Sequence, residues 1–103
     1  MCGIAGIVGV DRASITQFDS DIQKSIEYRG RDERGSWSDN QCSLFSSRLS
    51  IIDIEHGQQP MLDKTGRYTI VFNGAIYNYI ELRSQYKKRG AAFNTQSDTE
   101  VVL

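Results

Sequence analysis

No apolar segment of this 103-residue sequence is long, because charged or polar residues interrupt every hydrophobic run. A membrane-spanning helix needs roughly 18 or more consecutive apolar residues, so we expect no membrane span. The short runs suit strands and amphipathic helices instead. A folded chain of 11.6 kDa would expose about 5,800 Å² of surface and bury roughly 65% of its unfolded surface, which is enough for one small domain.

Charge and cysteine content exclude several classes of partner. The 12 Lys and Arg residues nearly balance the 13 Asp and Glu residues. Nucleic acids and anionic membranes attract proteins with surplus positive charge, so neither is an expected partner. Two cysteines, Cys2 and Cys42, are too few for a disulfide framework, and with His56 as the single histidine they do not make a zinc site. We expect no metal site and a reducing, cytoplasmic setting.

The first half of the chain predicts strands around one helix. Residues 2–10 are apolar and rich in glycine and β-branched side chains, which favours a strand. A helix is predicted over about residues 15–28, with Ser14 and Gln17 as a capping box. The charged, glycine-containing segment 29–35 predicts a loop. The helix has apolar residues at helical spacing: Ile15, Phe18, Ile22 and Ile26.

The second half predicts two more strands and a second helix. Residues 42–54 and 68–72 have strand composition, with a turn at 57–60 between them. Asn78 predicts the start of a helix that ends at the cationic segment 87–90. Its expected apolar positions are Ile80, Leu82 and Tyr86.

The last residues predict a helix start. Ser97 and Glu100 have capping-box spacing and directly precede the apolar residues 101–103. Because one helical turn is not stable alone, we expect this chain to be part of a longer one.

Cys2 directly follows the initiator Met1, so removal of Met1 would make it N-terminal. One residue would then carry a thiol nucleophile and an α-amine with a pKa of about 7.7 to 8.0. This amine could accept the thiol proton near neutral pH without a histidine. Position alone favours the simpler interpretation, a small buried strand residue.

Six short strings change that balance. Any one of them is weak evidence, but together and in this order they resemble the glutaminase domain of asparagine-synthetase-type class II glutamine amidotransferases. The strings are MCGIAG at 1–6, RGRD at 29–32, RLSIID at 48–53, QPM at 59–61, FNGAIYN at 72–78 and SDTE at 97–100.

The resemblance implies an α+β fold of the N-terminal nucleophile hydrolase type. This fold is a four-layer α/β/β/α sandwich with antiparallel sheets. Family domains are roughly twice as long, so we expect residues 1–103 to be the N-terminal half of a glutamine amidotransferase type 2 domain that is truncated at its C-terminus, with the synthetase domain absent. A half-sandwich would leave apolar sheet surface open, which favours a homo-oligomer or completion by a partner.

The resemblance also assigns roles to individual residues. Cys2 would attack the side-chain amide of glutamine and form a thioester, with its own α-amine as base. The Asn73 side chain and the Gly74 N–H would stabilise the oxyanion. Arg48 would pair with the α-carboxylate of glutamine and Asp98 with its α-ammonium group.

Three positions depart from the family pattern. Ala75 stands where the family has a Glu that takes part in the glutamine site, so this difference bears on glutamine affinity. Tyr28 and Arg31 stand where His and Pro are usual.

Simpler interpretations exist for most of these residues. Asn73 and Gly74 suit a strand-end turn, Arg48 a surface position, and Asp98 the favourable N-terminus of a helix. We expect a solvated helix end formed by four cations, Arg83, Lys87, Lys88 and Arg89.

The leading hypothesis is a glutaminase that releases glutamate and ammonia. The ammonia would supply an amide-forming synthetase domain in cis or in trans. No cofactor is expected for the glutaminase step, whereas ATP and Mg are expected for the synthetase domain alone. The alternative is a non-catalytic fragment or half-domain retained for association with a partner.

Overall fold

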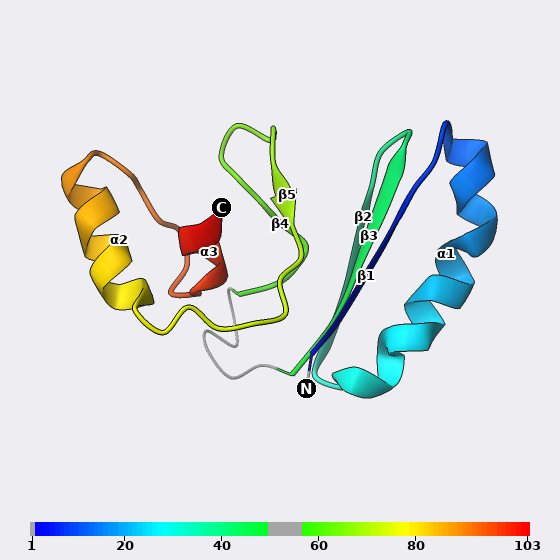
Figure 1. The fold of residues 1–103 in the computed structure, drawn as a ribbon, viewed down its shortest axis with the longest axis horizontal. Helices are drawn as coiled ribbons and strands as arrows, with labels where there is room; N and C mark the ends of the chain where they lie inside the picture. The colour runs from blue at the N-terminus through cyan, green and yellow to red at the C-terminus, as the bar shows by residue number, and fades with distance from the viewer. Residues whose placement is uncertain (1, 50–56) are drawn as a thin grey trace.

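The computed structural model describes residues 2–49 and 57–103, in which helices combine with antiparallel sheets (Figure 1). The expected α+β class is thereby confirmed. No helix in the described ranges is long and apolar enough to span a membrane. The elements in order are β1 (Gly3–Val8), α1 (Arg12–Ile26), the 3-10 turn η1 (Glu27–Arg29), β2 (Glu33–Ser38), β3 (Cys42–Arg48), β4 (Met61–Leu62), β5 (Thr69–Ile70), α2 (Tyr79–Lys88) and α3 (Thr99–Val102).

One helix covers one face of a three-stranded sheet (Figure 1). The strand order is β1-β3-β2, and both neighbouring pairs are antiparallel. Ile15 and Ile26 of α1 and Phe45 of β3 are buried and form most of the apolar core. The predicted first strand is confirmed, and its antiparallel pairing with β3 agrees with the N-terminal nucleophile hydrolase type of fold.

Helix α1 begins earlier than the sequence pattern suggested. The Asp11 side chain accepts a hydrogen bond from Ser14 N at 2.8 Å, and Asp11 N donates to Ser14 Oγ at 3.4 Å. The capping box is therefore formed by Asp11 and Ser14, and the prediction of Ser14 with Gln17 was wrong. Aspartate outcompetes later candidates because its short carboxylate reaches the free N–H groups of the first turn.

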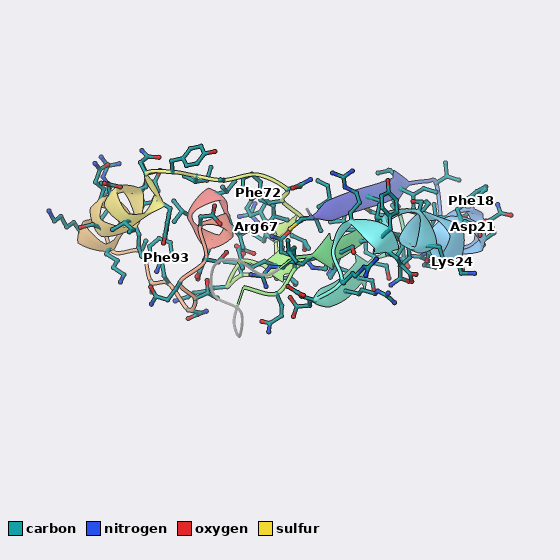
Figure 2. The ribbon with its side chains drawn as sticks, turned by 90° about the horizontal axis from the view of Figure 1, so that it is seen from below. Phe18, Asp21, Lys24, Arg67, Phe72 and Phe93 are labelled. Carbon is teal, nitrogen blue, oxygen red and sulfur yellow. The ribbon has the colours of Figure 1, made fainter. Side chains whose placement is uncertain are left out.

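The apolar face of α1 is narrower than predicted. At about 100° per residue, Ile22 and Ile26 lie within about 20° of Ile15 around the helix, whereas Phe18 lies about 60° away. Phe18 is accordingly 47% exposed and lies on the α1 end of the molecule (Figure 2).

Strand β2 begins inside the loop predicted at 29–35 and includes its last three residues, 33–35. It pairs with β3 from Glu33 opposite Arg48 to Ser38 opposite Ser43. Such pairing satisfies the backbone polar groups along the segment, so tertiary structure overrides its local composition. Strand β3 confirms the first part of the strand predicted at 42–54, and residues 50–56, which include His56, lie outside the described residues.

The strand predicted at 68–72 is only two residues long. Thr69 and Ile70 pair with Leu62 and Met61. The turn of this hairpin lies between β4 and β5 and not at Asn73. Strand pairing stops because Phe72 N donates to the Gln59 side chain at 2.6 Å instead of to a strand neighbour.

Helix α2 forms where it was predicted, after Asn78, and Gly90 follows its end with a φ of 96°. Its buried residue is Arg83, whereas Ile80 is 64% exposed. The expectation of a solvated Arg83 was wrong, because α2 packs against the segment before α3 through polar groups.

Helix α3 starts without the predicted capping box. The carboxylate of Glu100 accepts hydrogen bonds from Asn94 N and Thr95 N, both at 2.7 Å. Asp98 is the N-cap residue but makes no capping bond with its side chain. Its carboxylate has another partner, described below.

The sheet face opposite α1 exposes apolar side chains. Strand alternation places Ile4 and Val8 on this face, where they are 40% and 79% exposed. The molecule measures 44 × 28 × 18 Å, and its accessible surface of 6740 Å² exceeds the value of about 5,800 Å² typical of this mass. An open apolar sheet surface was expected of a half-sandwich.

The packing of α1 on the sheet predicts a large effect of truncating Ile15, which is 1% exposed. Ile15→Ala should lower the free energy of unfolding by about 2–5 kcal/mol, because it leaves a cavity under the helix. Ile80→Ala is the matched control on α2 and should change it by no more than about 0.5 kcal/mol. Urea denaturation followed by circular dichroism measures both, and equal losses would contradict the assigned core.

Candidate active site

Cys2 lies beside the end of β3, because it directly precedes β1 and Gly3 pairs with Ser47. Its Sγ accepts a hydrogen bond from Leu49 N at 3.3 Å and donates to Leu49 O at 3.6 Å. The thiol is partly buried and forms no disulfide. It therefore sits at the edge of the sheet, with its sulfur held by one backbone unit.

The carbonyl oxygen of Cys2 joins two distant segments. It accepts a hydrogen bond from Arg29 Nε at 3.0 Å and another from Asn73 Nδ2 at 3.0 Å. Asn73, predicted to stabilise an oxyanion, is thus within one hydrogen bond of the predicted nucleophilic residue. A strand-end turn at Asn73 and Gly74 is compatible with this contact, although the β4–β5 hairpin itself turns before β5.

Arg48 is buried, not a surface residue of the strand edge. Its side chain is 8% exposed and forms an ion pair from Nη1 to Glu33 Oε2 at 3.0 Å. The two residues face each other in the register of β2 and β3. A buried guanidinium requires such a partner, and the pair orients Arg48 at the end of its strand.

Gly30 lies against the main chain of Arg48. A Cβ at position 30 would lie 2.5 Å from the carbonyl carbon of Arg48, and the carbonyl of Gly30 accepts a hydrogen bond from Ser47 Oγ at 2.6 Å. Glycine is therefore required by the close approach of the two chains. The segment after η1 therefore packs directly against the backbone of Arg48.

Gln59 connects the two segments that carry the remaining predicted site residues. Its Oε1 accepts a hydrogen bond from Phe72 N at 2.6 Å, and its Nε2 donates to Thr99 Oγ1 at 3.2 Å. Gln59 is buried, and its carbonyl lies so close to Gly35 that a Cβ there would be 1.8 Å from the oxygen. One amide thus fixes the start of α3 relative to the 72–74 segment.

Asp98 is 8% exposed, and its Oδ2 accepts a hydrogen bond from Ile76 N at 2.9 Å. This contact joins the start of α3 to the chain just after Gly74 and Ala75. The backbone donor fixes the orientation of the carboxylate. Asp98 lies at a helix N-terminus, as its simpler interpretation predicted, but its side chain also binds the backbone of a distant segment.

Five of the six predicted site residues line one cavity of about 170 Å³, whereas Asn73 does not line it and contacts the Cys2 carbonyl instead. Gly74 and Ala75 are exposed at its edge. Phe72 lies in the middle of the molecule, between the α1 end and the α2 end (Figure 2). The cavity is lined by Cys2, Arg48, Leu49, Gln59, Phe72, Gly74, Ala75, Ser97, Asp98 and Thr99.

Some lining residues were not predicted from the sequence. Leu49, Gln59, Phe72, Ser97 and Thr99 all lie within or next to the six strings, which was the available signal. Glu33, the partner of Arg48, had no signal beyond a charged segment.

The other residues singled out in the sequence lie away from the cavity. Tyr28 and Arg31 are exposed and do not line it. Burial, and then the nearby charge of Asp39, raise the pKa of the Cys42 thiol, which keeps it protonated and unreactive. Within residues 2–49 and 57–103, no three His, Cys, Asp or Glu side chains are grouped to hold a metal ion.

The sequence matches the glutamine amidotransferase domain family over residues 1–103, its whole length. The chain belongs to this family.

Similar proteins include several asparagine synthetases whose names specify glutamine hydrolysis. Asparagine synthetase (glutamine-hydrolyzing) 1 of Bacillus subtilis is 42% identical over 107 residues and covers all of this amidotransferase chain. A putative asparagine synthetase of Mycobacterium tuberculosis is 40% identical over 98% of the chain, and a probable one of Schizosaccharomyces pombe is 35% identical over all of it. The chain spans 17%, 17% and 19% of these three relatives.

The bridging role of Gln59 predicts a loss of stability in Gln59→Leu. This change leaves Phe72 N and the Thr99 hydroxyl without their partner, which should cost about 1–3 kcal/mol in the free energy of unfolding. Gln85→Leu, on the exposed surface of α2, is the matched control and should stay within about 0.5 kcal/mol. Chemical denaturation of both variants measures the difference, and equal stability would contradict the bridge.

Proposed function

We propose that this amidotransferase domain hydrolyses the side-chain amide of glutamine through Cys2. The observation that carries the proposal is the convergence of Cys2, Arg48, Gly74 and Asp98 on one cavity. These residues come from distant parts of the sequence. Together they supply a nucleophile, a cation, a backbone donor and an anion. The names of the similar proteins give the same substrate.

In the first step, the Cys2 thiol transfers its proton to the α-amine that removal of Met1 would free. Sγ then bonds to the amide carbon of glutamine, and the electrons of the C=O bond move to its oxygen. When the tetrahedral intermediate collapses, the C–N bond breaks and the α-ammonium proton passes to the leaving nitrogen. Ammonia leaves and a glutamyl thioester remains.

In the second step, water attacks the thioester carbon, the α-amine takes a proton from the water, and the C–S bond breaks. The α-ammonium group returns this proton to the departing sulfur, so glutamate leaves and the thiol and the α-amine are regenerated. Both tetrahedral intermediates carry a negative oxygen, for which the Asn73 amide and the Gly74 N–H are the proposed donors. The bond from Asn73 Nδ2 to the Cys2 carbonyl keeps that amide next to the reacting residue.

The charges at the cavity suit a zwitterionic amino acid. We assign the α-carboxylate of glutamine to Arg48, whose planar guanidinium can make paired hydrogen bonds. The α-ammonium group is assigned to Asp98, which a backbone N–H already orients. The Glu33 ion pair keeps Arg48 from swinging out of the cavity in the absence of substrate.

The ammonia would pass to an amide-forming synthetase domain in cis or in trans, as the names of the similar proteins suggest. ATP and Mg would serve that domain, and the hydrolysis itself would need neither. The free thiols of Cys2 and Cys42 suit a reducing, cytoplasmic setting.

An electrophilic glutamine analogue tests the proposal. Intact-mass analysis and peptide mapping should show loss of Met1 and one adduct on Cys2, formed in a saturable reaction that glutamine inhibits. Cys2→Ala should abolish the adduct because it removes the nucleophile. Cys42→Ser, the matched control, should keep it because the Cys42 thiol stays protonated.

Two results would reverse this conclusion. Retention of Met1 would leave Cys2 without a free α-amine and exclude the proposed base. Absence of a Cys2 adduct in the processed protein would favour the alternative of a non-catalytic half-domain, for which the exposed apolar sheet face is the supporting observation.

The residue at position 75 should tune affinity for glutamine. Ala75 lines the cavity together with Asp98, and the N–H of the next residue, Ile76, donates to the Asp98 carboxylate. A carboxylate at position 75 would therefore add an acceptor for the α-ammonium group. Ala75→Glu should lower the half-saturating concentration of the analogue about tenfold, and the uncharged control Ala75→Gln should lower it less. An unchanged or higher value in Ala75→Glu would contradict this assignment.

A further inference from the structure

Arg83 is a buried cation for which the proposed reaction has no direct use. It lies in the middle of α2 and is 7% exposed, although its neighbours on the helix, Ile80 and Ser84, are exposed. It does not line the active-site cavity. The burial of such a side chain requires an explanation, because arginine is almost never buried without a specific partner.

The guanidinium holds the segment that precedes Asp98. Nη1 donates to Gln96 Oε1 at 2.7 Å, and Nη2 donates to the carbonyl oxygen of Ser97 at 3.1 Å. The rings of Tyr79 and Phe93 stack on the same group, with 5.8 and 5.3 Å between Cζ and the ring centroids. Phe93 lies at the α2 end of the molecule (Figure 2).

Burial of the Arg83 cation carries a desolvation cost that its partners only partly offset. Among the described residues it has no carboxylate partner, and its Nε is buried without a hydrogen-bond acceptor. An apolar side chain of similar size would avoid that desolvation cost. What arginine adds is a pair of directed donors in a plane fixed by two aromatic rings.

Ser97, whose carbonyl accepts from Arg83, belongs to the segment that lines the cavity. Ser97 directly precedes Asp98, and its Oγ accepts a hydrogen bond from Thr99 N at 3.1 Å. Ser97, Asp98 and Thr99 all line the cavity. Displacement of the Ser97 carbonyl would therefore move the Asp98 carboxylate relative to Ile76 and the cavity.

We infer that Arg83 is a positioning residue, which acts through the Ser97 carbonyl to set the place of Asp98 and hence the affinity for the α-ammonium group of the substrate. The inference rests on the proposed function. It assigns to α2, a helix outside the cavity, a part in recognising amino acids over their deaminated analogues.

Arg83→Lys tests the inference while preserving the charge. Lysine cannot donate to Gln96 and Ser97 in one plane, so the half-saturating concentration of the electrophilic glutamine analogue should rise about tenfold. The maximal rate of Cys2 labelling should stay within about twofold, since the nucleophile and oxyanion donors are unchanged. Arg89→Lys, an exposed position at the end of the same helix, is the matched control and should behave like the wild type.

A second probe separates positioning from general damage. An otherwise identical electrophile without the α-ammonium group should have the same half-saturating concentration in the wild type and in Arg83→Lys. If Arg83→Lys does not fold, Gln96→Met at an exposed position removes one acceptor and should raise the half-saturating concentration of the amino-acid analogue about threefold.

Each failure has its own signature. If the wild type forms no Cys2 adduct, the proposed function fails and takes this inference with it. If the wild type is labelled but Arg83→Lys, or Gln96→Met in its place, has an unchanged half-saturating concentration, the inference alone is overturned. Equal weakening of both probes would also overturn it, because Arg83 would then serve only the folded structure.

Discussion

Antiparallel pairing between β1 and β3 determines what surrounds the thiol of Cys2. With Gly3 opposite Ser47, the residue before β1 meets the residues at the end of β3, so Sγ lies on the backbone of Leu49 next to Arg48. A slip of one residue between β1 and β3 would move Cys2 away from Leu49, whereas the pairing of Arg48 with Glu33 depends on the register of β2 and β3. The positions of the thiol and the cation thus both depend on β3.

Polar side chains, more than an apolar core, organise the second half of the molecule. Met61 is the one buried apolar residue described after position 57, whereas Gln59, Arg83 and Asp98 are all buried there and all hydrogen-bonded. Hydrogen bonds are directional, so a few of them can place a short helix such as α3 where its apolar contacts are few. The same directionality makes single substitutions costly.

Local patterns predicted the parts of the fold that depend on neighbouring residues. Periodicity found β1, α1, β3 and α2, and the strings contained the positions that line the cavity, half of which had been assigned a role. The errors at the start of α1 and at Arg83 have a different origin. A capping residue is chosen among near-equal candidates, and the burial of Arg83 depends on rings and carbonyls brought in from residues 93–97, which spacing along one helix does not reveal.

Gly35 of β2 packs against the carbonyl of Gln59, which lines the cavity, so the sheet and the cavity are in contact through these two residues. Position 35 lies in the middle of β2 and touches no predicted catalytic group, yet a single added methyl group would be forced against the backbone that carries the bridging amide. Strand composition would accept many residues there. At position 35, the side chain is therefore limited by the backbone of Gln59 and not by strand propensity.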